Sequence, residues 1–374
     1  MSASNANATT TSAGNKSIGS IQLLFLLHTT QVGVGILGLV KFVAKSAGHD
    51  AALAILVSGL YPQVGLLFMW LLLKRFQNLG IYDIHTKLFG KWLGKLFSLC
   101  FAGYCLFAYF MVLRTYVELV DTWMFPMTPV WVLTTLFLVP TLYAGMIGLR
   151  LLGRFAVAAF FLTIWIIVLV YIPMGDGSFT HLLPSGGEGV KAIYQGSLLS
   201  ALSILGLELF MVYYPYLTKR KGTLKLASIA SWFTILVYAW VAAATLMFFS
   251  PEQLDKTIWP MLTMFKHVQI PFIERFETII IAVWVLQIVN TAGTYLWAGV
   301  EGMDAIVKLT RKRKVWLYLL LIIATLYFSN RIESRTQMNV LLDRTSKVGF
   351  GYLIGYPLLL WLLSLVLRKK GGAA

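Results

Sequence analysis

The first apolar run of the chain is long enough to cross a bilayer, but polar and glycine residues interrupt it near its middle. Residues 21–43 read IQLLFLLHTTQVGVGILGLVKFV. About 20 apolar residues span the hydrocarbon core of a membrane, and each glycine in a helix interior is about 1 kcal/mol less favourable than alanine. In lipid, unwound backbone persists only where protein or a water-lined cavity satisfies its polar groups. The run therefore predicts a broken helix with a mid-membrane binding site, where a half-helix starting near Gly35 favours an anionic group.

Nine further apolar runs follow, so the sequence predicts an all-α integral membrane protein with ten transmembrane helices. Hydrophobic residues make up 58% of the 374 residues and charged residues 12%, whereas soluble domains carry about 25% charged residues. The predicted spans are residues 21–43, 51–73, 94–117, 130–148, 151–172, 191–217, 223–249, 275–300, 314–329 and 348–367.

We expect residues 21–370 to form a single transmembrane domain. The N-terminal residues and the two cysteines indicate no further domain or site. Residues 1–20 are rich in Ser, Asn, Thr and Ala, with Lys16 as the one charge, which predicts a disordered tail. A secretory signal would place its apolar core earlier, before a small-residue cleavage site. Cys100 and Cys105 are five residues apart and fall on different helix faces, so they indicate neither a disulfide framework nor a metal cluster.

The basic charge of the chain is distributed as a topology signal. With the N-terminal tail assigned to the inside, 20 of the 31 Lys and Arg residues fall in inside loops and 10 outside, while Arg114 lies within the third span. Of the 15 acidic residues, 11 lie outside. Cytoplasmic loops carry an excess of Lys and Arg, so we expect both termini to be cytoplasmic. The net charge of +16 then faces anionic lipid, and nucleic acid is not expected as a partner.

The loops leave no room for a soluble catalytic domain. No inside loop exceeds about 20 residues, and the sequence has no phosphate loop, zinc spacing or hydrolase serine motif. We therefore expect a protein that is not an enzyme and that uses no cofactor or metal. The longest outside loop, residues 250–274, contains three prolines. Two interpretations of this loop stay open, a lid over an outer vestibule or a structured connector.

A second interruption lies in the sixth span, which reads KAIYQGSLLSALSILGLELFMVYYPYL and is broken at residues 203–208. Glu208 is the one acidic residue deep in a predicted span, and an ionised carboxylate there costs several kcal/mol unless it is paired, neutralised or hydrated. Glu208 either caps its own half-helix, or it also faces a cationic group or takes a proton.

The two interruptions are five spans apart in a chain of ten. Matching breaks in two halves are typical of a transporter-type site between inverted repeats. The sequence thus predicts a LeuT-like 5+5 inverted repeat, with residues 21–172 and 191–368 as the repeats and with helices 1 and 6 discontinuous.

Five stretches occur in a characteristic order and spacing. They are IGSIQLLFLLHTTQVGVGILGLV from residue 18, AGHDA from residue 47, GLE from residue 206, YPY from residue 214, and IPFIERFE from residue 270 running into Trp284. Together they resemble the B subunit of bacterial spore germinant receptors. The resemblance implies membership of the amino acid–polyamine–organocation superfamily, a location in the spore inner membrane and sensing of small nutrients such as amino acids. It also implies partner subunits A, with membrane and soluble parts, and C, a lipoprotein.

These features predict that a small zwitterion, most simply an α-amino acid, binds between spans one and six. Its carboxylate would meet the N–H groups at Gly33, Val34 and Gly35, and its ammonium would meet unwound carbonyls near residues 203–206, with Glu208 in reach directly or through water. Spans three and eight would supply the side walls. The predicted ligand-binding residues are Thr30, Gln31, Gly33, Val34, Gly35, Tyr104, Ser203, Leu205, Gly206, Glu208, Asn290 and Thr291.

Some candidate residues have a plain packing interpretation beside the functional one. Tyr104 belongs to a three/four-spaced set that is equally typical of helix packing. Gln287, Asn290, Thr291 and Thr294 share a face of span eight, which serves either a cavity or interhelical hydrogen bonds. His28 either hydrogen-bonds within the bundle or relays protons. Arg114 and Glu118 are four residues apart, so we expect them to pair.

Two functions compete at this point. In a receptor, ligand binding selects one arrangement of the two half-bundles and shifts that equilibrium. In a permease, the same movement completes a transport cycle coupled to protons or sodium. A scaffold or ion pathway with a vestigial site is a third, weaker interpretation. The sequence has no lysine midway along span five, where some proton-coupled relatives place one, and the family resemblance favours the receptor.

Overall fold

The computed structural model describes residues 17–77, 79–183, 186–200, 205–268, 271 and 274–367, and these residues are almost entirely helical. Within these described ranges, seven helices or merged helices are long and apolar enough to cross a membrane. They are Gly35–Phe76, Ile81–Trp123, Val130–Ile147, Leu149–Met174, Thr223–Phe248, Phe276–Val307 and Arg335–Leu367.

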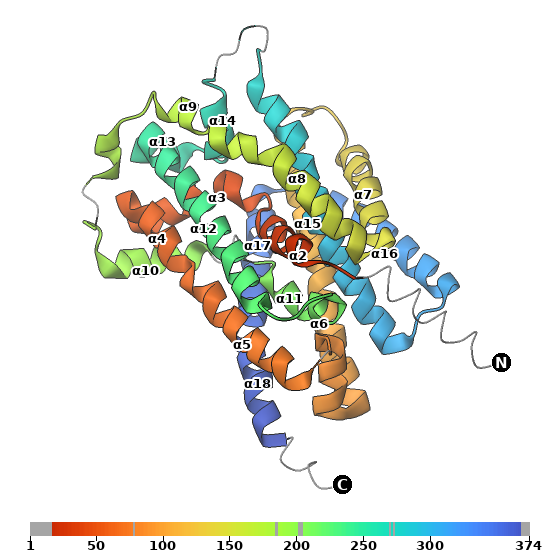
Figure 1. Ribbon diagram of the computed structural model, residues 1–374. Helices are drawn as coiled ribbons and strands as arrows, with labels where there is room; N and C mark the ends of the chain where they lie inside the picture. The colour runs from red at the N-terminus through yellow and green to blue at the C-terminus, as the bar shows by residue number, and fades with distance from the viewer. Residues whose placement is uncertain are drawn as a thin grey trace, which may run out of the picture.

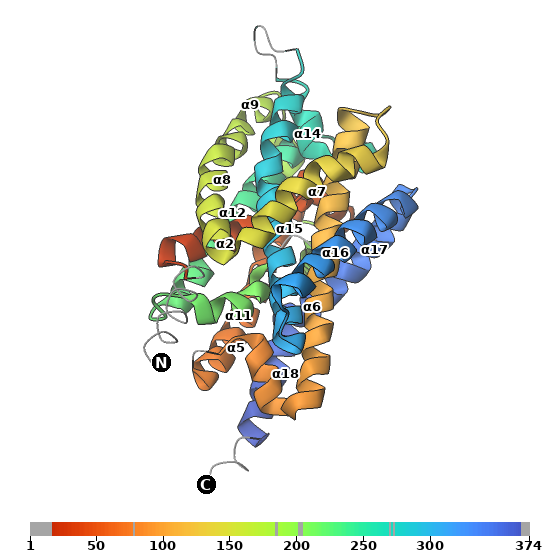
Figure 2. The ribbon, with the colours of Figure 1, turned by 90° about the vertical axis from the view of Figure 1, so that its right-hand side faces the viewer.

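Long helices form the body of the bundle, and short helical pieces occupy its interior and its ends (Figures 1 and 2). The longer helices are α2 Ser20–Gln31, α3 Gly35–Ala47, α5 Leu60–Phe76, α6 Ile81–Trp123, α7 Val130–Ile147, α8 Leu149–Leu169, α10 Gly189–Leu199, α12 Thr223–Phe248, α15 Phe276–Val307, α16 Arg311–Arg331, α17 Arg335–Phe350 and α18 Tyr356–Leu367. The shorter pieces are η1 Gly48–Asp50, α4 Ala51–Ser58, α9 Tyr171–Met174, η2 Phe179–Leu182, η4 Leu207–Leu209, α11 Phe210–Tyr213, η5 Tyr214–Tyr216, α13 Pro251–Lys256, α14 Pro260–Phe265 and the π-helical turn η6 Gly351–Gly355.

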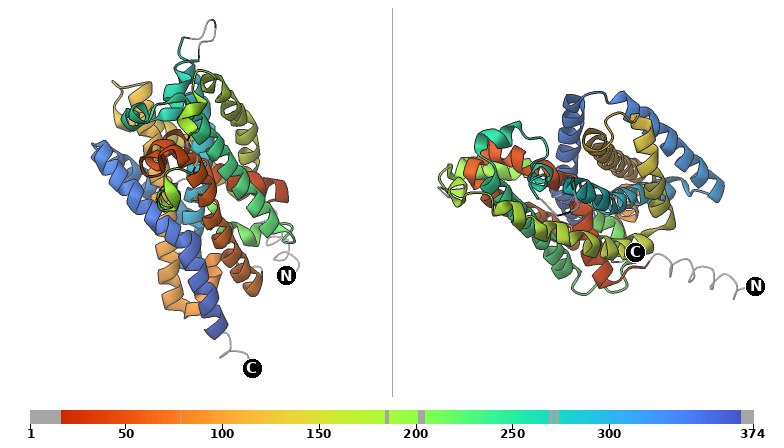
Figure 3. Two further views of the ribbon diagram at one scale, coloured as in Figure 1. Left: turned by 90° about the vertical axis from the view of Figure 1, so that its left-hand side faces the viewer. Right: turned by 90° about the horizontal axis from the view of Figure 1, so that it is seen from above.

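Helix α15 is the central element of the bundle. It packs against α2, α6, α7 and α8, and it is the most buried of the seven spanning helices. Helix α2 in turn packs against α8 and α12, while α3 packs against α10. Viewed along its long axis, the bundle has α16 at its rim (Figure 3), where α16 packs mainly against α7. The polar residues of α15 therefore face protein on several sides.

The N-terminal segment is fixed to the end of the second interruption by a short backbone bridge. Ile18 is fully buried. Its N–H donates to the carbonyl of Tyr216 at 3.0 Å, and its own carbonyl accepts from the N–H of Thr218 at 3.0 Å. The predicted tail of residues 1–20 is thus too long at its C-terminal end, because Ile18 and Gly19 are ordered and helix α2 begins at Ser20. Residues 1–16 lie outside the described residues.

The predicted tenth span begins too late. Residues 335–347 were expected in an outside loop, but they form helix α17, which continues through η6 into α18. The reason is composition, because Arg335, Asp343, Arg344 and Lys347 lower the hydropathy of a segment that is nevertheless helical. Several of its polar side chains face a cavity inside the bundle.

Candidate functional site

The chain leaves helical geometry inside the first predicted span, between the end of α2 at Gln31 and the start of α3 at Gly35. A helix end exposes carbonyl groups that need partners, and here side chains of the neighbouring helices α15 and α12 supply them. Thr291 Oγ1 donates to Thr29 O (2.9 Å), Tyr238 Oη to Gln31 O (2.7 Å) and Trp284 Nε1 to Gly33 O (3.3 Å). The interruption is therefore supported within the protein, as unwound backbone at membrane depth requires.

The second interruption touches the first. Gly206 has φ +114°, and a Cβ atom there would lie 2.9 Å from the carbonyl carbon and oxygen of Thr30. Such a φ and such a close backbone approach both require glycine. The short helix η4 begins directly after Gly206, at Leu207. Residues 201–204, which include the predicted site residue Ser203, lie outside the described residues.

Glu208 is fully buried and accepts three hydrogen bonds. The N–H of Gly206 donates to Oε2 at 2.8 Å, and the hydroxyls of Tyr104 and Tyr295 donate to Oε1 at 2.7 and 2.6 Å. No ion pair between described residues includes Glu208. Three donors and no acceptor form the environment that suits an ionised carboxylate, which only accepts hydrogen bonds. Glu208 thus caps its own segment and also ties α6 and α15 to it.

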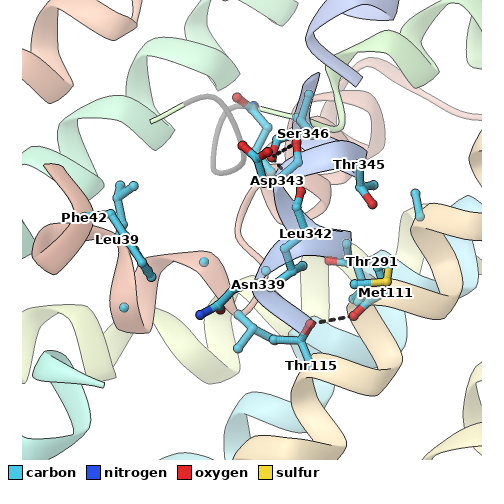
Figure 4. A pocket seen from close by; sticks show the side chains of 18 of the residues that line it. Leu39, Phe42, Met111, Thr115, Thr291, Asn339, Leu342, Asp343, Thr345 and Ser346 are labelled. Atoms are coloured by element: carbon cyan, nitrogen blue, oxygen red, sulfur yellow. Dashed lines mark hydrogen bonds between the residues drawn. The ribbon is translucent and has the colours of Figure 1, made fainter. Parts of the chain in front are cut away.

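A cavity of about 240 Å³ lies beside the two interruptions, between α3, α6, α15 and α17 (Figure 4). Eight of the predicted site residues line it: Thr30, Gln31, Gly33, Val34, Gly35, Tyr104, Leu205 and Thr291. Gly206, Glu208 and Asn290 do not line it. Tyr104 and Tyr295 line the cavity and donate their hydroxyl protons to Glu208. The carboxylate thus fixes the orientation of two tyrosine hydroxyls in the cavity wall.

Gln31 lines the cavity, and its side-chain oxygen has no partner among the described residues. Its Nε2 donates to the carbonyl of Leu27 at 3.1 Å, while its Oε1 is buried without a hydrogen bond. A buried, unpaired carbonyl oxygen costs about 1–3 kcal/mol. A turn of the amide toward the cavity would let a ligand donor recover that free energy.

The wall formed by α17 was missed by the sequence analysis. In Figure 4 its side chains lie across the cavity from Leu39 and Phe42 of α3. Asn339, Asp343 and Ser346 are spaced as i, i+4 and i+7, which places them on one helix face. This spacing was a usable signal, but only for a segment already known to be helical. The α17 residues that line the cavity are Arg335, Asn339, Leu342, Asp343, Thr345 and Ser346.

Tyr295 and Trp259 were also missed. Tyr295 follows Thr291 by one helical turn, so it belongs to the polar stripe already noted on this helix. Trp259 lies between α13 and α14, in the long loop of residues 250–274. Its ring packs at Gly38, where a Cβ would lie 3.3 Å from the indole. This loop therefore contributes a residue to the cavity wall, which both the lid and the structured connector allow.

The expected pair of Arg114 and Glu118 is wrong. Arg114 donates to the carbonyls of Ser329 (3.1 Å) and Ile332 (2.9 Å), whereas Glu118 pairs with Arg335 at 2.9 Å. Spacing of four residues along α6 allowed the pair, but the start of α17 brings a better-placed partner. His28 follows its packing interpretation, since its Nδ1 lies 2.8 Å from Thr234 Oγ1 inside the bundle.

The polar face of α15 serves mainly to hold other helices. Asn290 Nδ2 donates to Thr29 Oγ1 at 2.7 Å, and Gln287 Nε2 donates to Thr163 Oγ1 at 3.1 Å. Asn290 thus binds the last turn of α2, next to the first interruption, to α15. Within the described ranges, no three His, Cys, Asp or Glu residues lie together in a way that could hold a metal ion.

Comparisons with known proteins cover almost the whole chain. The sequence profile of a family described as "Spore germination protein", the spore permease family, matches residues 17–338. Spore germination protein GerQB of Bacillus cereus is 31% identical over 346 residues, which cover 92% of this chain and 95% of GerQB. Spore germination protein A2 of Bacillus subtilis strain 168 is 24% identical over 358 residues, with coverages of 94% and 96%.

A solved structure shares the arrangement of helices. The crystal structure of MhsT in complex with L-phenylalanine superimposes with a TM-score of 0.63, covering 94% of this chain and 89% of MhsT, at 13% sequence identity. At this identity the similarity concerns the fold alone, and it is a LeuT-like fold. The profile match and the identity to GerQB confirm the resemblance seen in the sequence. This multi-pass membrane protein therefore belongs to the spore germination protein family and is a germinant receptor B-type protein.

Proposed function

We propose that this chain is the ligand-binding membrane subunit of a spore germinant receptor and that it senses a small nutrient, most simply an α-amino acid. The observation that carries the proposal is the cavity of about 240 Å³ at the two interruptions. Cavities of this kind, mostly apolar with a few convergent polar groups, are typical ligand sites. The shared fold with a protein crystallised in complex with L-phenylalanine is compatible with such a ligand.

The two ends of an amino acid find complementary groups around this cavity. At one side, the first-turn N–H groups of α3 have no partner within their own helix, although the N–H of Gly33 already donates to Gln31 O at 3.1 Å. We therefore assign the carboxylate to the N–H groups of Val34 and Gly35 rather than to all three predicted donors. We assign the ammonium group to Gln31, whose unpaired Oε1 would turn toward the cavity to accept from it.

Tyr104 and Tyr295 complete the ammonium site in this proposal. Because each hydroxyl proton points to Glu208, the oxygen lone pairs stay free to accept from a ligand. The negative charge behind them strengthens these acceptors for a cation. The ligand side chain would then pack against Ala108 and Met111 of α6 and Leu342 of α17, which are the apolar part of the wall.

We infer ten membrane spans arranged as a 5+5 inverted repeat with discontinuous helices 1 and 6. The seven helices selected by length and composition omit segments that are short or charged. Helix α2 has 12 residues and α10 has 11, as expected for halves of broken spans, and α16 begins with RKRK. In this arrangement α2 with α3 forms span one, α10 with η4 to η5 forms span six, and both termini are cytoplasmic.

We further propose that the chain works in the spore inner membrane with the A and C subunits of a germinant receptor. No inside loop is large enough for a signalling domain, so a movement of helices has to reach those partners. An amino acid permease coupled to protons or sodium is the second candidate, because a LeuT-like fold with a central cavity suits a carrier equally well.

Equilibrium binding of radiolabelled amino acids to vesicles bearing the chain tests the site. Tyr104→Phe removes one hydrogen-bonding group from the cavity, and a bond to a charged group is worth about 1.5–3 kcal/mol, so we expect affinity to fall by about 10-fold or more. Tyr109→Phe is the matched control, because Tyr109 lies on the same helix and bonds Thr325 Oγ1 at 2.9 Å away from the cavity. Equal affinity of both variants would contradict the proposed site.

Two further measurements separate receptor from carrier. Spores whose only receptor carries Glu208→Gln or Gly35→Leu should lose their amino acid response, and a wild-type response of both variants would discard the site. Saturable, gradient-driven uptake by the isolated chain in vesicles would favour the permease. Binding without uptake would favour the receptor.

A further inference from the structure

Helix α17 forms one wall of the central cavity, yet it is held on one side only. Its main contacts with other described elements are with α6 and with the π-helical turn η6 that follows it. Its inner face, with Leu342, Thr345 and Ser346, lines the cavity. Its outer face is exposed, with Val348 at 51%. A helix that packs on one side has fewer contacts to lose when it moves than a helix surrounded by the bundle.

The foot of α17 has the features of a hinge. The five residues Gly351–Gly355 form a π-helical turn, and such turns occur mostly inside α-helices and frequently at functional sites. A Cβ atom at Gly351 or Gly355 would meet no atom within 4 Å, so packing does not require glycine there. At Gly349, by contrast, a Cβ would lie 2.7 Å from the hydroxyl of Tyr104. The glycines of the turn thus supply backbone freedom rather than space.

The same turn contacts the hydrogen-bond system of Glu208. Tyr352 lies within η6, and its ring centroid is 4.9 Å from that of Tyr104. It also meets the ring of Phe101 edge-on at 5.0 Å. Because Tyr104 lines the cavity and donates to Glu208, a change at the cavity reaches the foot of α17 through the contact between the tilted rings of Tyr104 and Tyr352.

The head of α17 is held by Arg335 and by Met338, which is fully buried and whose Sδ accepts from Thr115 Oγ1 of α6 at 4.0 Å. Arg335 Nη1 pairs with Glu118 Oε1 of α6 at 2.9 Å, and its guanidinium lies over the ring of Trp259 at 4.7 Å. The Arg335 side chain is 27% exposed and that of Glu118 is 18% exposed. A partly exposed ion pair and a cation–π contact together contribute about 1–2 kcal/mol. A contact of this strength breaks and re-forms readily, as a latch must.

We propose that α17 is a hinged wall of the cavity, which pivots on the turn Gly351–Gly355 and is latched closed by Arg335 on Glu118 and Trp259. Tyr352 is a positioning residue that couples this pivot to Tyr104. A ligand between α3 and α17 contacts the wall in its closed position and shifts the equilibrium by its differential affinity for the two positions. The wall thereby converts occupancy of the cavity into a movement of a helix whose other face is open to partners.

The test follows the wall by cysteine labelling and uses no ligand, so its outcome is independent of the proposed nutrient. In a chain with Cys100→Ser and Cys105→Ala, Thr345→Cys places a reporter on the cavity side of α17, because Thr345 lines the cavity and is only 6% exposed. The purified full chain in detergent micelles is labelled with a hydrophilic maleimide. Glu118→Gln, which weakens the latch, should raise the labelling rate about fivefold, the equivalent of about 1 kcal/mol.

Stiffening the hinge should cancel the increase in labelling rate caused by Glu118→Gln. Gly351→Ala fits without a clash, and adding it to Glu118→Gln should return the labelling rate to that of the latched chain. Gly103→Ala is the matched control, because a Cβ there also meets no atom within 4 Å but α6 has no hinge at that position. A labelling rate unaffected by Glu118→Gln would overturn the latch. Equal effects of the two glycine substitutions would overturn the hinge.

The positioning role of Tyr352 has its own readout. No described side chain bonds its hydroxyl, so the ring is the part that acts. Tyr352→Phe should leave the labelling rate of the Thr345→Cys reporter unchanged, whereas Tyr352→Ala should raise it toward the rate of the unlatched chain. Circular dichroism of both variants checks that they remain folded. If the alanine variant is folded and labels at the parental rate, Tyr352 does not couple the hinge to Tyr104.

Discussion

Replacing Tyr104 and Tyr295 with phenylalanine, singly and together, tests whether Glu208 is held as a buried carboxylate. Each substitution keeps the aromatic ring and removes one hydroxyl that donates to the same oxygen, Oε1, at 2.7 or 2.6 Å. A hydrogen bond to a charged group contributes about 1.5–3 kcal/mol to the free energy of unfolding. After one substitution the other tyrosine still satisfies Oε1. After both, this oxygen has no donor in a site from which solvent is excluded.

The double substitution should therefore cost more than the sum of the single ones. Interaction free energies between residues that share a partner are about 0.5–3 kcal/mol, and we expect at least about 1 kcal/mol here, because a charged oxygen would be left unpaired. Denaturant titration in detergent micelles, followed by the fluorescence of the 12 tryptophans, measures all four free energies of unfolding.

Tyr109→Phe is the reference for this double-mutant cycle of Tyr104 and Tyr295. It breaks a bond between two neutral hydroxyls, Tyr109 Oη and Thr325 Oγ1 at 2.9 Å, which is worth about 0.5–1.5 kcal/mol. Two results would refute the reasoning. If the Tyr104 and Tyr295 substitutions are each no more costly than Tyr109→Phe, Glu208 carries no charge. If their costs simply add, the two hydroxyls do not share one acceptor.

Two further predictions concern the interruptions and the cavity. Gly206→Ala should lower the free energy of unfolding by at least about 1–2 kcal/mol, because φ is +114° and the new Cβ would press on Thr30. Gly33→Ala should be tolerated, because a Cβ there meets no atom within 4 Å. Equal unfolding midpoints of the two variants in the same titration would contradict the contact between the two interruptions. Ala108→Leu should fill part of the cavity and weaken the binding of larger amino acids by about 1–3 kcal/mol, while the binding of glycine stays unchanged. Competition against a radiolabelled amino acid measures these affinities. Equal weakening for all amino acids would place the ligand side chain elsewhere.

The first interruption could be anticipated from the sequence because its cause is local. Two glycines one residue apart and a polar triplet interrupt an apolar run, and the structure ends α2 at Gln31 and begins α3 at Gly35. The unusual cost of an acidic residue inside a span likewise singled out Glu208. What the sequence could not supply is the set of partners, since Tyr104 and Tyr295 are 104 and 87 residues away along the chain.

Helix α17 escaped prediction for a related reason. A hydropathy window averages over all faces of a helix, so a segment with one polar face at a cavity reads as a loop. Arg335, Asp343 and Lys347 produced that average, although Asp343 and Lys347 pair with each other at 2.7 Å along the helix. Because α17 was not predicted as a helix, the partner expected for Glu118 was also wrong. Spacing along α6 favoured Arg114, while Arg335 could be considered only once α17 had been placed beside α6.

One junction connects every element that the proposed function needs. Glu208 joins the second interruption to α6 through Tyr104 and to α15 through Tyr295, and Gly206 lies directly against the first interruption at Thr30. A displacement of either half-bundle must therefore keep or break hydrogen bonds at one buried carboxylate. Because cores with such bonds have discrete rather than graded arrangements, a ligand that contacts Tyr104 and Tyr295 has a two-state element to bias. A carrier and a sensor can share this interior, and they differ in whether the displaced state opens the cavity to the other side of the membrane or moves α17 against a partner.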